Sequence, residues 1–183
     1  MADAQIAMVR HRIHHLCLTE DGTTGSPVVG VLSEHDLMVM QGNNPAILIR
    51  ETRRCKTSGE LREIRERAEQ LLEKYIYQEV AISFISTVMT EINDAIIARC
   101  LELAEAALEE GGQEAPAAGY CWLALGSEGR GEQLLRTDQD NALVFENVPE
   151  EDHEKVKAYY LELARLTTTA LNEVGFDYCP GEM

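Results

Sequence analysis

The first 56 residues alternate short β-branched runs with turn sequences. The two runs are Arg12–Leu18 and Val28–Leu32, and the sequence EDGTTGSP between them is rich in turn-forming residues. Ser33 follows directly and precedes an apolar stretch, which is typical of a helix N-cap, and Gly42–Pro45 ends that stretch. This pattern predicts a strand, a turn, a second strand and a helix.

From position 57 the apolar residues recur every three or four positions. Thr57 with Glu60 fits a capping box, and the periodicity after it predicts an amphipathic helix with a break at Tyr77–Glu79. The same spacing predicts a second helix over Ala81–Glu110, which two consecutive glycines end. Two antiparallel helices of this length need a further surface against which to bury their apolar stripes.

The last third of the chain returns to alternating strands and helices. The predicted elements are a strand at Tyr120–Leu125, a turn with a short helix at Gly126–Leu135, a strand at Asn141–Phe145, a helix from Pro149 to Gly175, and the start of a strand in Phe176–Met183. The fold class predicted is α/β in its α+β form. Its three segments are residues 1–56, a long helical pair over 57–112, and a domain with a mixed sheet over 113–183.

Charge and cysteine usage narrow the function classes. The net charge is −16, and residues 57–183 carry all of it. An excess of acid argues against binding nucleic acid or anionic membranes, because both need clustered Lys and Arg. The five cysteines form no CxxC pair, which favours free thiols in a reducing compartment. The sequence also lacks a signal-peptide pattern and an apolar run long enough to span a membrane, so we expect a cytoplasmic protein.

The stretch Leu125–Phe145, LGSEGRGEQLLRTDQDNALVF, carries the candidate chemistry. Asp138 and Asp140 lie two residues apart at the start of a predicted strand, so both side chains project to one face. Mg²⁺ binds one or two carboxylates together with phosphate oxygens and water, and Gly126-Ser127 opens the turn where a phosphate could approach the backbone. The alternative is a polar turn that enters a strand and binds nothing.

The same residues resemble a known signature. Gly126-Ser127 followed by Asp138 and Asp140 resembles the GS…DxD motif of the DNA polymerase beta-type nucleotidyltransferase superfamily. The longer string GSEGRGEQ…TDQDNAL is similar to a family of nucleotidyltransferases related to the protein-PII uridylyltransferase and the glutamine-synthetase adenylyltransferase, and usually joined to CBS domains. The resemblance implies that Gly126 and Ser127 contact nucleotide phosphate and that Asp138 and Asp140 bind Mg²⁺. The motif is completed by Arg130, Glu132, Gln133, Thr137 and Asn141.

Two further roles in this motif have alternatives. Arg130 is expected near the triphosphate, where its guanidinium offsets acidic neighbours; otherwise it balances Glu128 and Glu132 on a surface. The resemblance also implies a third carboxylate on a later strand, for which Asp177 and Glu182 are candidates. Because the family continues beyond a Cys-Pro-Gly sequence like the one at 179–181, we expect this chain to be truncated within its catalytic domain.

A second resemblance lies near the N-terminus. The sequence VGVLSEHDL at positions 29–37 is similar to the last strand and helix start of a CBS motif. In that family the residues equivalent to Ser33 and Asp36 bind adenosine nucleotides in an intact motif pair. The alternative is that Ser33 is only a helix cap and Asp36 only a first-turn acid.

The combined expectation is a Mg²⁺-dependent transfer of a nucleoside monophosphate from an NTP to an acceptor hydroxyl, with protein acceptors included, in signal transduction. The rival hypothesis is a nucleotide-sensing regulatory module that signals through the CBS-like and helical segments without catalysis. The apolar stripes over Leu61–Leu108 are compatible with a homo-oligomer.

Overall fold

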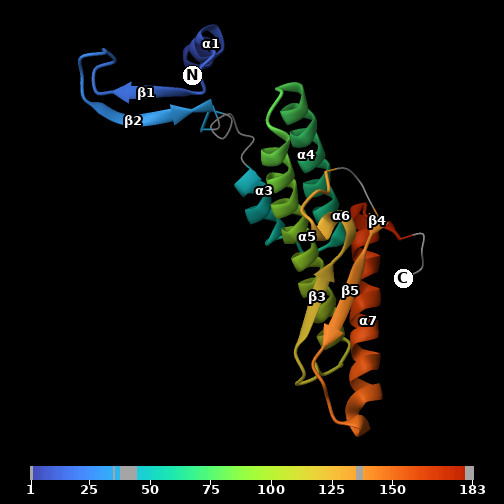
Figure 1. Ribbon diagram of the computed structural model, residues 1–183. Helices are drawn as coiled ribbons and strands as arrows, with labels where there is room; N and C mark the ends of the chain where they lie inside the picture. Colours follow the sequence, from blue (N-terminus) through green and yellow to red (C-terminus); the bar gives the residue numbers. More distant parts are fainter. Residues whose placement is uncertain (1, 35, 38–44, 135–137, 180–183) are drawn as a thin grey trace. The chain divides into compact units, whose positions relative to one another are not determined.

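The computed structural model describes residues 2–34, 36–37, 45–134 and 138–179. The chain forms two compact units, Met1–Ile47 and Leu48–Met183, and each is described by itself (Figure 1). Helices and small sheets occur together, which confirms the α+β class. The predicted helical pair and the last third of the chain both lie in the second unit.

The N-terminal unit is built on a two-stranded antiparallel ribbon. Strands β1 (His15–Thr19) and β2 (Val28–Ser33) pair with Cys17 opposite Val31, close to the two runs that the sequence predicts. A helix, α1 (Ala2–His11), precedes them and was not predicted. The helix expected after Ser33 falls mostly on residues outside the described ranges.

Three long helices form the body of the second unit. Helix α4 (Ser58–Tyr77) begins where the capping box predicts, since the Thr57 hydroxyl accepts a hydrogen bond from the Glu60 N–H at 3.2 Å. It ends at the predicted break, and α5 (Ile82–Glu110) follows. Helix α7 (Glu150–Val174) packs against both and supplies the surface that their apolar stripes needed. Residues buried in this core include Leu61, Ile64, Leu72, Ile85, Met89, Ile92, Ile96, Leu163, Leu171 and Val174.

A shorter helix, α3 (Pro45–Thr52), corrects the sequence interpretation. Pro45 was read only as the end of the preceding helix. Proline is also favoured at the first position of a helix, where its missing N–H costs nothing, and here it opens one. Leu48 and Thr52 are buried, so α3 packs with one face.

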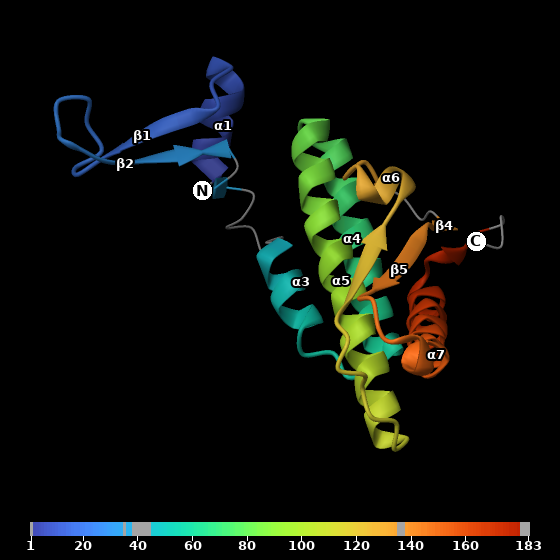
Figure 2. The ribbon, with the colours of Figure 1, turned by 60° about the horizontal axis from the view of Figure 1, so that its bottom comes forward.

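The four strands described in the second unit form two separate two-stranded sheets, and β4 of one sheet is followed almost directly along the chain by β5 of the other. Strand β3 (Tyr120–Ala124) pairs antiparallel with β5 (Asn141–Phe145), and β4 (Asp138–Gln139) pairs parallel with β6 (Asp177–Tyr178). Both strand directions therefore occur in the C-terminal segment, as the sequence predicted. Strands β3 and β5 pack along α5 and α7 (Figure 2), where side chains of both strands contact a buried cluster on the two helices.

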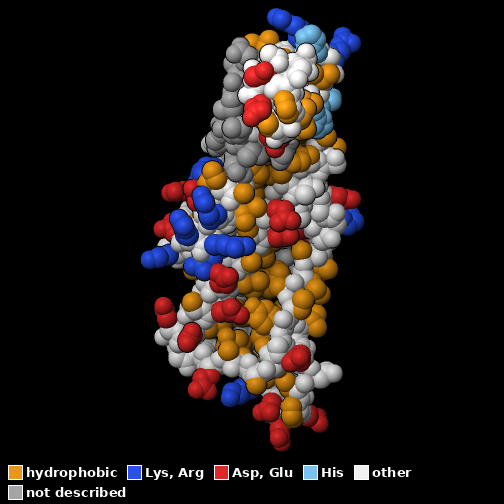
Figure 3. All heavy atoms as spheres, turned by 90° about the vertical axis from the view of Figure 1, so that its left-hand side faces the viewer, with side chains coloured by type: hydrophobic (Ala, Val, Ile, Leu, Met, Phe, Trp, Pro, Cys, Tyr) orange, Lys and Arg blue, Asp and Glu red, His pale blue; other side chains and the backbone are white. Residues whose placement is uncertain are grey.

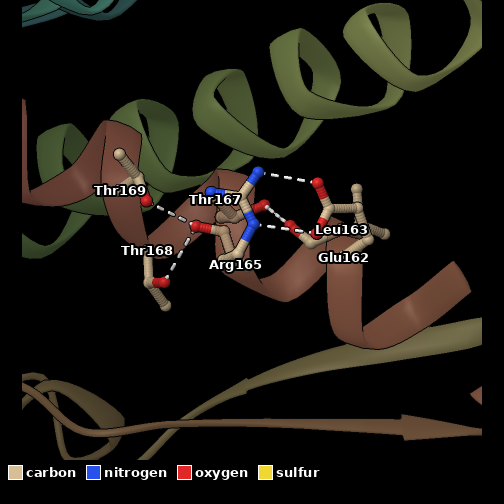
Figure 4. Close-up of polar contacts among 6 residues, drawn as sticks. All are labelled: Glu162, Leu163, Arg165, Thr167, Thr168 and Thr169. Atoms are coloured by element: carbon tan, nitrogen blue, oxygen red, sulfur yellow. Dashed lines mark hydrogen bonds and ion pairs between the residues drawn. The ribbon is translucent and has the colours of Figure 1, made fainter. Parts of the chain in front are cut away.

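Side-chain hydroxyls of α7 bond to the helix's own backbone, and one carbonyl of the helix also accepts a hydrogen bond from β4. The hydroxyls of Thr168 and Thr169 both donate to the Arg165 carbonyl, and Thr167 donates to the Leu163 carbonyl (Figure 4). The buried Gln139 amide donates to the Thr168 carbonyl at 3.1 Å. This hydrogen bond fixes β4 against α7.

The surface is unevenly charged. Figure 3 shows Lys and Arg side chains gathered on one part of the visible face, and the exposed basic residues of α3 and the segment after it are Arg50, Arg53, Arg54 and Lys56. None of the helices in the described ranges has the length and apolar character required to cross a membrane.

Candidate metal centre

The centre lies at the corner where β3 passes into the Gly126 turn. The Leu125 N–H donates to the Asp140 carbonyl at 2.7 Å, which brings the turn beside Asp140. Gly126 has a φ of +57°, and a Cβ at this position would collide with the Asp140 carboxylate oxygen. Glycine therefore suits this position, because the backbone is left-handed and the Asp140 carboxylate approaches closely.

Two carboxylates and one thiol meet at this corner. One ligand atom from each of Asp138, Asp140 and Cys179 lies within 4.8 Å of the other two, and all three residues are half-buried. Asp138 and Asp140 come together as their spacing of two predicts. Cys179 comes from the other side of the parallel ladder, where Tyr178 lies opposite Gln139. That these residues bind a cation stays a prediction.

A buried carboxylate stands next to this cluster. Glu128 on the short helix α6 (Gly126–Gly129) is only 8% exposed, and its Oε1 has no hydrogen-bond partner within the described residues. Burial raises the pKa of the Glu128 carboxyl to about 7, repulsion from Asp94 and Asp140 adds to the rise, and Arg65 opposes it. The raised pKa shows that Arg65 does not fully offset the burial and the repulsion.

The turn after Gly126 is held by a buried chain of polar side chains. Arg65 on α4 donates to the Asn93 amide oxygen at 3.1 Å, and the Asn93 amide nitrogen donates to Gln133 at 3.1 Å. The Ser86 hydroxyl on α5 donates to the Gly131 carbonyl. The helical pair therefore supports the candidate site directly. The motif alone assigns no role to Gln133, and the sequence signal for Arg65 and Asn93 is only that both are polar residues at apolar-stripe positions.

The Arg65 guanidinium also ties the end of the chain to this support. It lies 4.0 Å above the ring of Phe176, at cation–π distance. Phe176 is itself buried, and its carbonyl accepts a hydrogen bond from the Gln139 amide at 2.9 Å. The segment that leads to Cys179 is thereby fixed to the same elements that carry the aspartates.

Other residues of the motif lie apart from the cluster or outside the described ranges. Arg130 is exposed and pairs with Glu132 at 2.9 Å, which is the surface arrangement considered as its alternative. Asp177 is exposed and is not among the clustered ligands. Thr137 and Glu182 lie outside the described residues.

The two N-terminal candidate residues, Ser33 and Asp36, are hydrogen-bonded to each other. The Asp36 carboxylate accepts from the Ser33 N–H at 2.8 Å and from the Ser33 hydroxyl at 2.7 Å. The Asp36 N–H donates to the Ser33 hydroxyl at 3.1 Å. These reciprocal bonds have the pattern of a capping box. Binding of an adenosine nucleotide there stays a prediction.

The donor set at the Asp138 corner suits a divalent cation. Carboxylates are the ligands that Mg²⁺ and Mn²⁺ share, a thiolate adds affinity for softer cations, and half-burial leaves room for substrate oxygens or water. Gly126 allows the Asp140 carboxylate to lie close to its backbone, and Glu128 is a further acidic group that interacts with Asp140.

Comparison with known protein families gives one match. Residues 66–183, more than half of the chain, match the model of the family "Putative nucleotidyltransferase DUF294". The matched region contains most of α4, all of α5, and the whole candidate centre. No curated protein and no solved structure matches the chain.

Proposed function

The chain belongs to this nucleotidyltransferase family, and we propose that it transfers a nucleoside monophosphate from an NTP to an acceptor hydroxyl with a divalent cation at Asp138 and Asp140. The observation that carries the proposal is the meeting of both carboxylates beside the Gly126 turn. In the reaction the acceptor oxygen bonds to the α-phosphorus, the bond from that phosphorus to pyrophosphate breaks, and the hydroxyl proton is released to solvent.

Each part of the corner has a role in this proposal. Asp138 and Asp140 hold the cation. We propose Mg²⁺, because this ion is commonly bound by two carboxylates, with phosphate oxygens and water as its other ligands. A bound cation supplies positive charge against the triphosphate. Gly126 and Ser127 border the space for the phosphates, since the positive φ of Gly126 brings the backbone close without a side chain.

The acceptor and the biological role are further parts of the proposal. The resemblance of the motif to uridylyl- and adenylyltransferases that modify proteins supports a protein hydroxyl as acceptor and a role in signal transduction. The β1–β2 ribbon that leads into Ser33 and Asp36 supports a CBS-like sensor for adenosine nucleotides when its partner motif is present. Five free cysteines support a reducing, cytoplasmic setting.

Labelling from an α-phosphate-labelled NTP tests the function. With Mg²⁺ and a cell extract as the source of acceptors, the chain should release pyrophosphate and attach label to a protein. The double variant D138A/D140A should lose at least ~100-fold of this rate, in line with the loss of a group that stabilises the transition state. The control is D152A, which removes an exposed carboxylate from the first turn of α7.

Two outcomes would contradict the proposal. Labelling by the double variant at the rate of the unaltered chain would show that the two aspartates are not the catalytic centre. Binding of Mg²⁺ and NTP to the unaltered chain without pyrophosphate release, over all four ribonucleotides, would favour the nucleotide-sensing module.

A further inference from the structure

We propose that Cys179 is a third protein ligand of the Asp138–Asp140 centre and gives it a preference for a thiophilic divalent cation, such as Co²⁺ or Zn²⁺, when no nucleotide is bound. The inference rests on the proposed role of the two aspartates as cation ligands, and it adds a residue and a metal selectivity to that role.

The three ligand atoms are close to coordination geometry. They lie within 4.8 Å of one another. Ligands of one cation cannot be farther apart than the sum of two metal–ligand distances, which is about 4.5 Å for a thiolate and a carboxylate on Zn²⁺. Small side-chain rotations of the half-buried residues would therefore complete the site.

The fold fixes Cys179 in this position. Gly175 ends α7 with a φ of +114°, and the chain turns back to run parallel to β4. The register pairs Asp138 with Asp177 and Gln139 with Tyr178, so the next residues along the two strands are Asp140 and Cys179. Strand pairing thus brings the backbone of Cys179 next to that of Asp140.

An independent feature indicates that this corner is built for a cation. The Glu128 side chain is repelled by the Asp140 carboxylate, is more than nine-tenths buried, and leaves Oε1 without a hydrogen-bond partner within the described residues. A carboxylate is costly to bury near other acids unless positive charge compensates it, and Arg65 supplies only part of that charge for Glu128. A divalent cation between Asp138, Asp140 and Cys179 would supply that charge.

The thiol changes which cation this corner prefers. Mg²⁺ takes hard oxygen ligands and depends on substrate phosphates to complete its shell, whereas thiolates favour softer cations. The nucleotide-free protein should therefore bind Co²⁺ or Zn²⁺ much more tightly than Mg²⁺. A bound thiophilic cation then competes with the Mg²⁺ that arrives with the nucleotide.

Titration of the whole chain with Co²⁺ tests the assignment. A thiolate on Co²⁺ gives a sulfur-to-metal charge-transfer absorption in the near ultraviolet, which carboxylates do not give. We expect this absorption in the unaltered chain, its loss in C179S together with a decrease in Co²⁺ affinity of ~10-fold or more, and its retention in C121S. Cys121 is the matched control because it is an exposed thiol on β3 outside the cluster.

Absence of the absorption in the unaltered chain, or its persistence in C179S, would overturn the proposal. A measurement without substitution covers the case in which C179S does not fold. Zn²⁺ should protect Cys179 from alkylation by iodoacetamide, read by peptide mass spectrometry, while Cys121 stays reactive. Equal alkylation of Cys179 with and without Zn²⁺ would also overturn it.

The same variants separate this inference from the proposed function. If C179S loses the Co²⁺ absorption, and pyrophosphate release by the unaltered chain requires Asp138 and Asp140, both hold. If the unaltered chain shows the absorption and no NTP turnover, the thiolate site stands and the proposed function fails. If turnover requires Asp138 and Asp140 while C179S binds Co²⁺ unchanged, the proposed function stands and the inference about Cys179 fails.

Discussion

Two acidic motifs, one in each compact unit, use their carboxylates in different ways. In the N-terminal unit, Asp36 and Ser33 satisfy each other through three hydrogen bonds within four residues. In the C-terminal unit, the carboxylates of Asp138 and Asp140 form no hydrogen bond or ion pair with any described residue. The Ser33–Asp36 hydrogen bonds give the first carboxylate a structural role without a ligand, whereas the second pair of carboxylates is the one for which we propose a cation.

The two motifs also differ in what positions them. The Ser33–Asp36 pair is local to one turn of chain. The Asp138–Asp140 centre depends on remote segments, because β3 carries the turn to Asp140, the helical pair supports the turn, and β6 brings Cys179. Distant substitutions should therefore disturb the second motif and leave the first unchanged.

Replacement of Asn93 by leucine is the strongest test of this remote support. N93L removes an acceptor from the buried Arg65 guanidinium and a donor to Gln133. We expect a loss of about 3 kcal/mol in the free energy of unfolding, because hydrogen bonds to buried charged groups are among the stronger ones. Urea denaturation followed by circular dichroism measures it, with T87A on the exposed face of α5 as control.

The result also has a local readout. N93L should lower the Co²⁺ affinity of the Asp138 centre and leave the amide hydrogen exchange of β1 and β2 unchanged. If N93L leaves stability and Co²⁺ affinity at the values of T87A, the helical pair does not support the site. The two motifs would then differ only in how far apart their residues lie in the sequence.

A smaller loss of stability is expected from G126A. The left-handed φ of +57° costs a residue with a side chain about 1–2 kcal/mol, and the new Cβ collides with the Asp140 carboxylate. Gly22 is the matched control, since its φ is +82° and no atom lies within 4 Å of its Cβ position. Calorimetric titration with Mn²⁺ should show weaker binding in G126A alone. Equal Mn²⁺ affinity in G126A and G22A would mean that Asp140 does not need this close approach.

Local signals in the sequence account for what could be predicted. The capping box at Thr57, the spacing of Asp138 and Asp140, and the terminating glycines act over a few residues, and the structure has these features. The proximity of Cys179 to the aspartates depends on a parallel pairing between segments almost forty residues apart, which periodicity does not encode.

Polar residues within apolar stripes were the other missed signal. Arg65 and Asn93 are almost fully buried, yet each sits among leucines, isoleucines and alanines on its helix. Hydrophobic spacing alone treats such positions as tolerated exceptions. Their meaning becomes visible only when the partner, Gln133, is placed by the fold.

Glu128 should make stability depend on pH. Burial raises its pKa to about 7 in the folded chain, against 4.5 as the ordinary value. Below pH 4.5 the carboxyl is protonated in both states and has no effect; between pH 4.5 and 7 the unfolded chain loses the proton first, so stability falls as pH rises. E128Q should remove this slope, match the unaltered chain at pH 4, and be more stable at pH 8.

Thermal unfolding in metal-free buffer at these pH values measures the slope. The control is E132Q, which removes an exposed carboxylate from the same segment. An identical pH slope in E128Q and the unaltered chain would show that Glu128 is not the buried titrating group beside Asp140.

The smallest effect is expected for S33A, in the Ser33–Asp36 pair of the N-terminal unit. Loss of the hydroxyl removes one bond to the Asp36 carboxylate and the acceptor for the Asp36 N–H, which costs about 1 kcal/mol for a helix cap. Amide exchange in β2 should then accelerate by roughly fivefold, with Co²⁺ binding at the Asp138 centre unchanged. If S33A instead weakens the binding of AMP or ATP while amide exchange in β2 stays the same, Ser33 is a ligand residue rather than a cap. Both motifs would then bind ligands, and the hydrogen bonds between Ser33 and Asp36 would not distinguish a structural motif from a binding site.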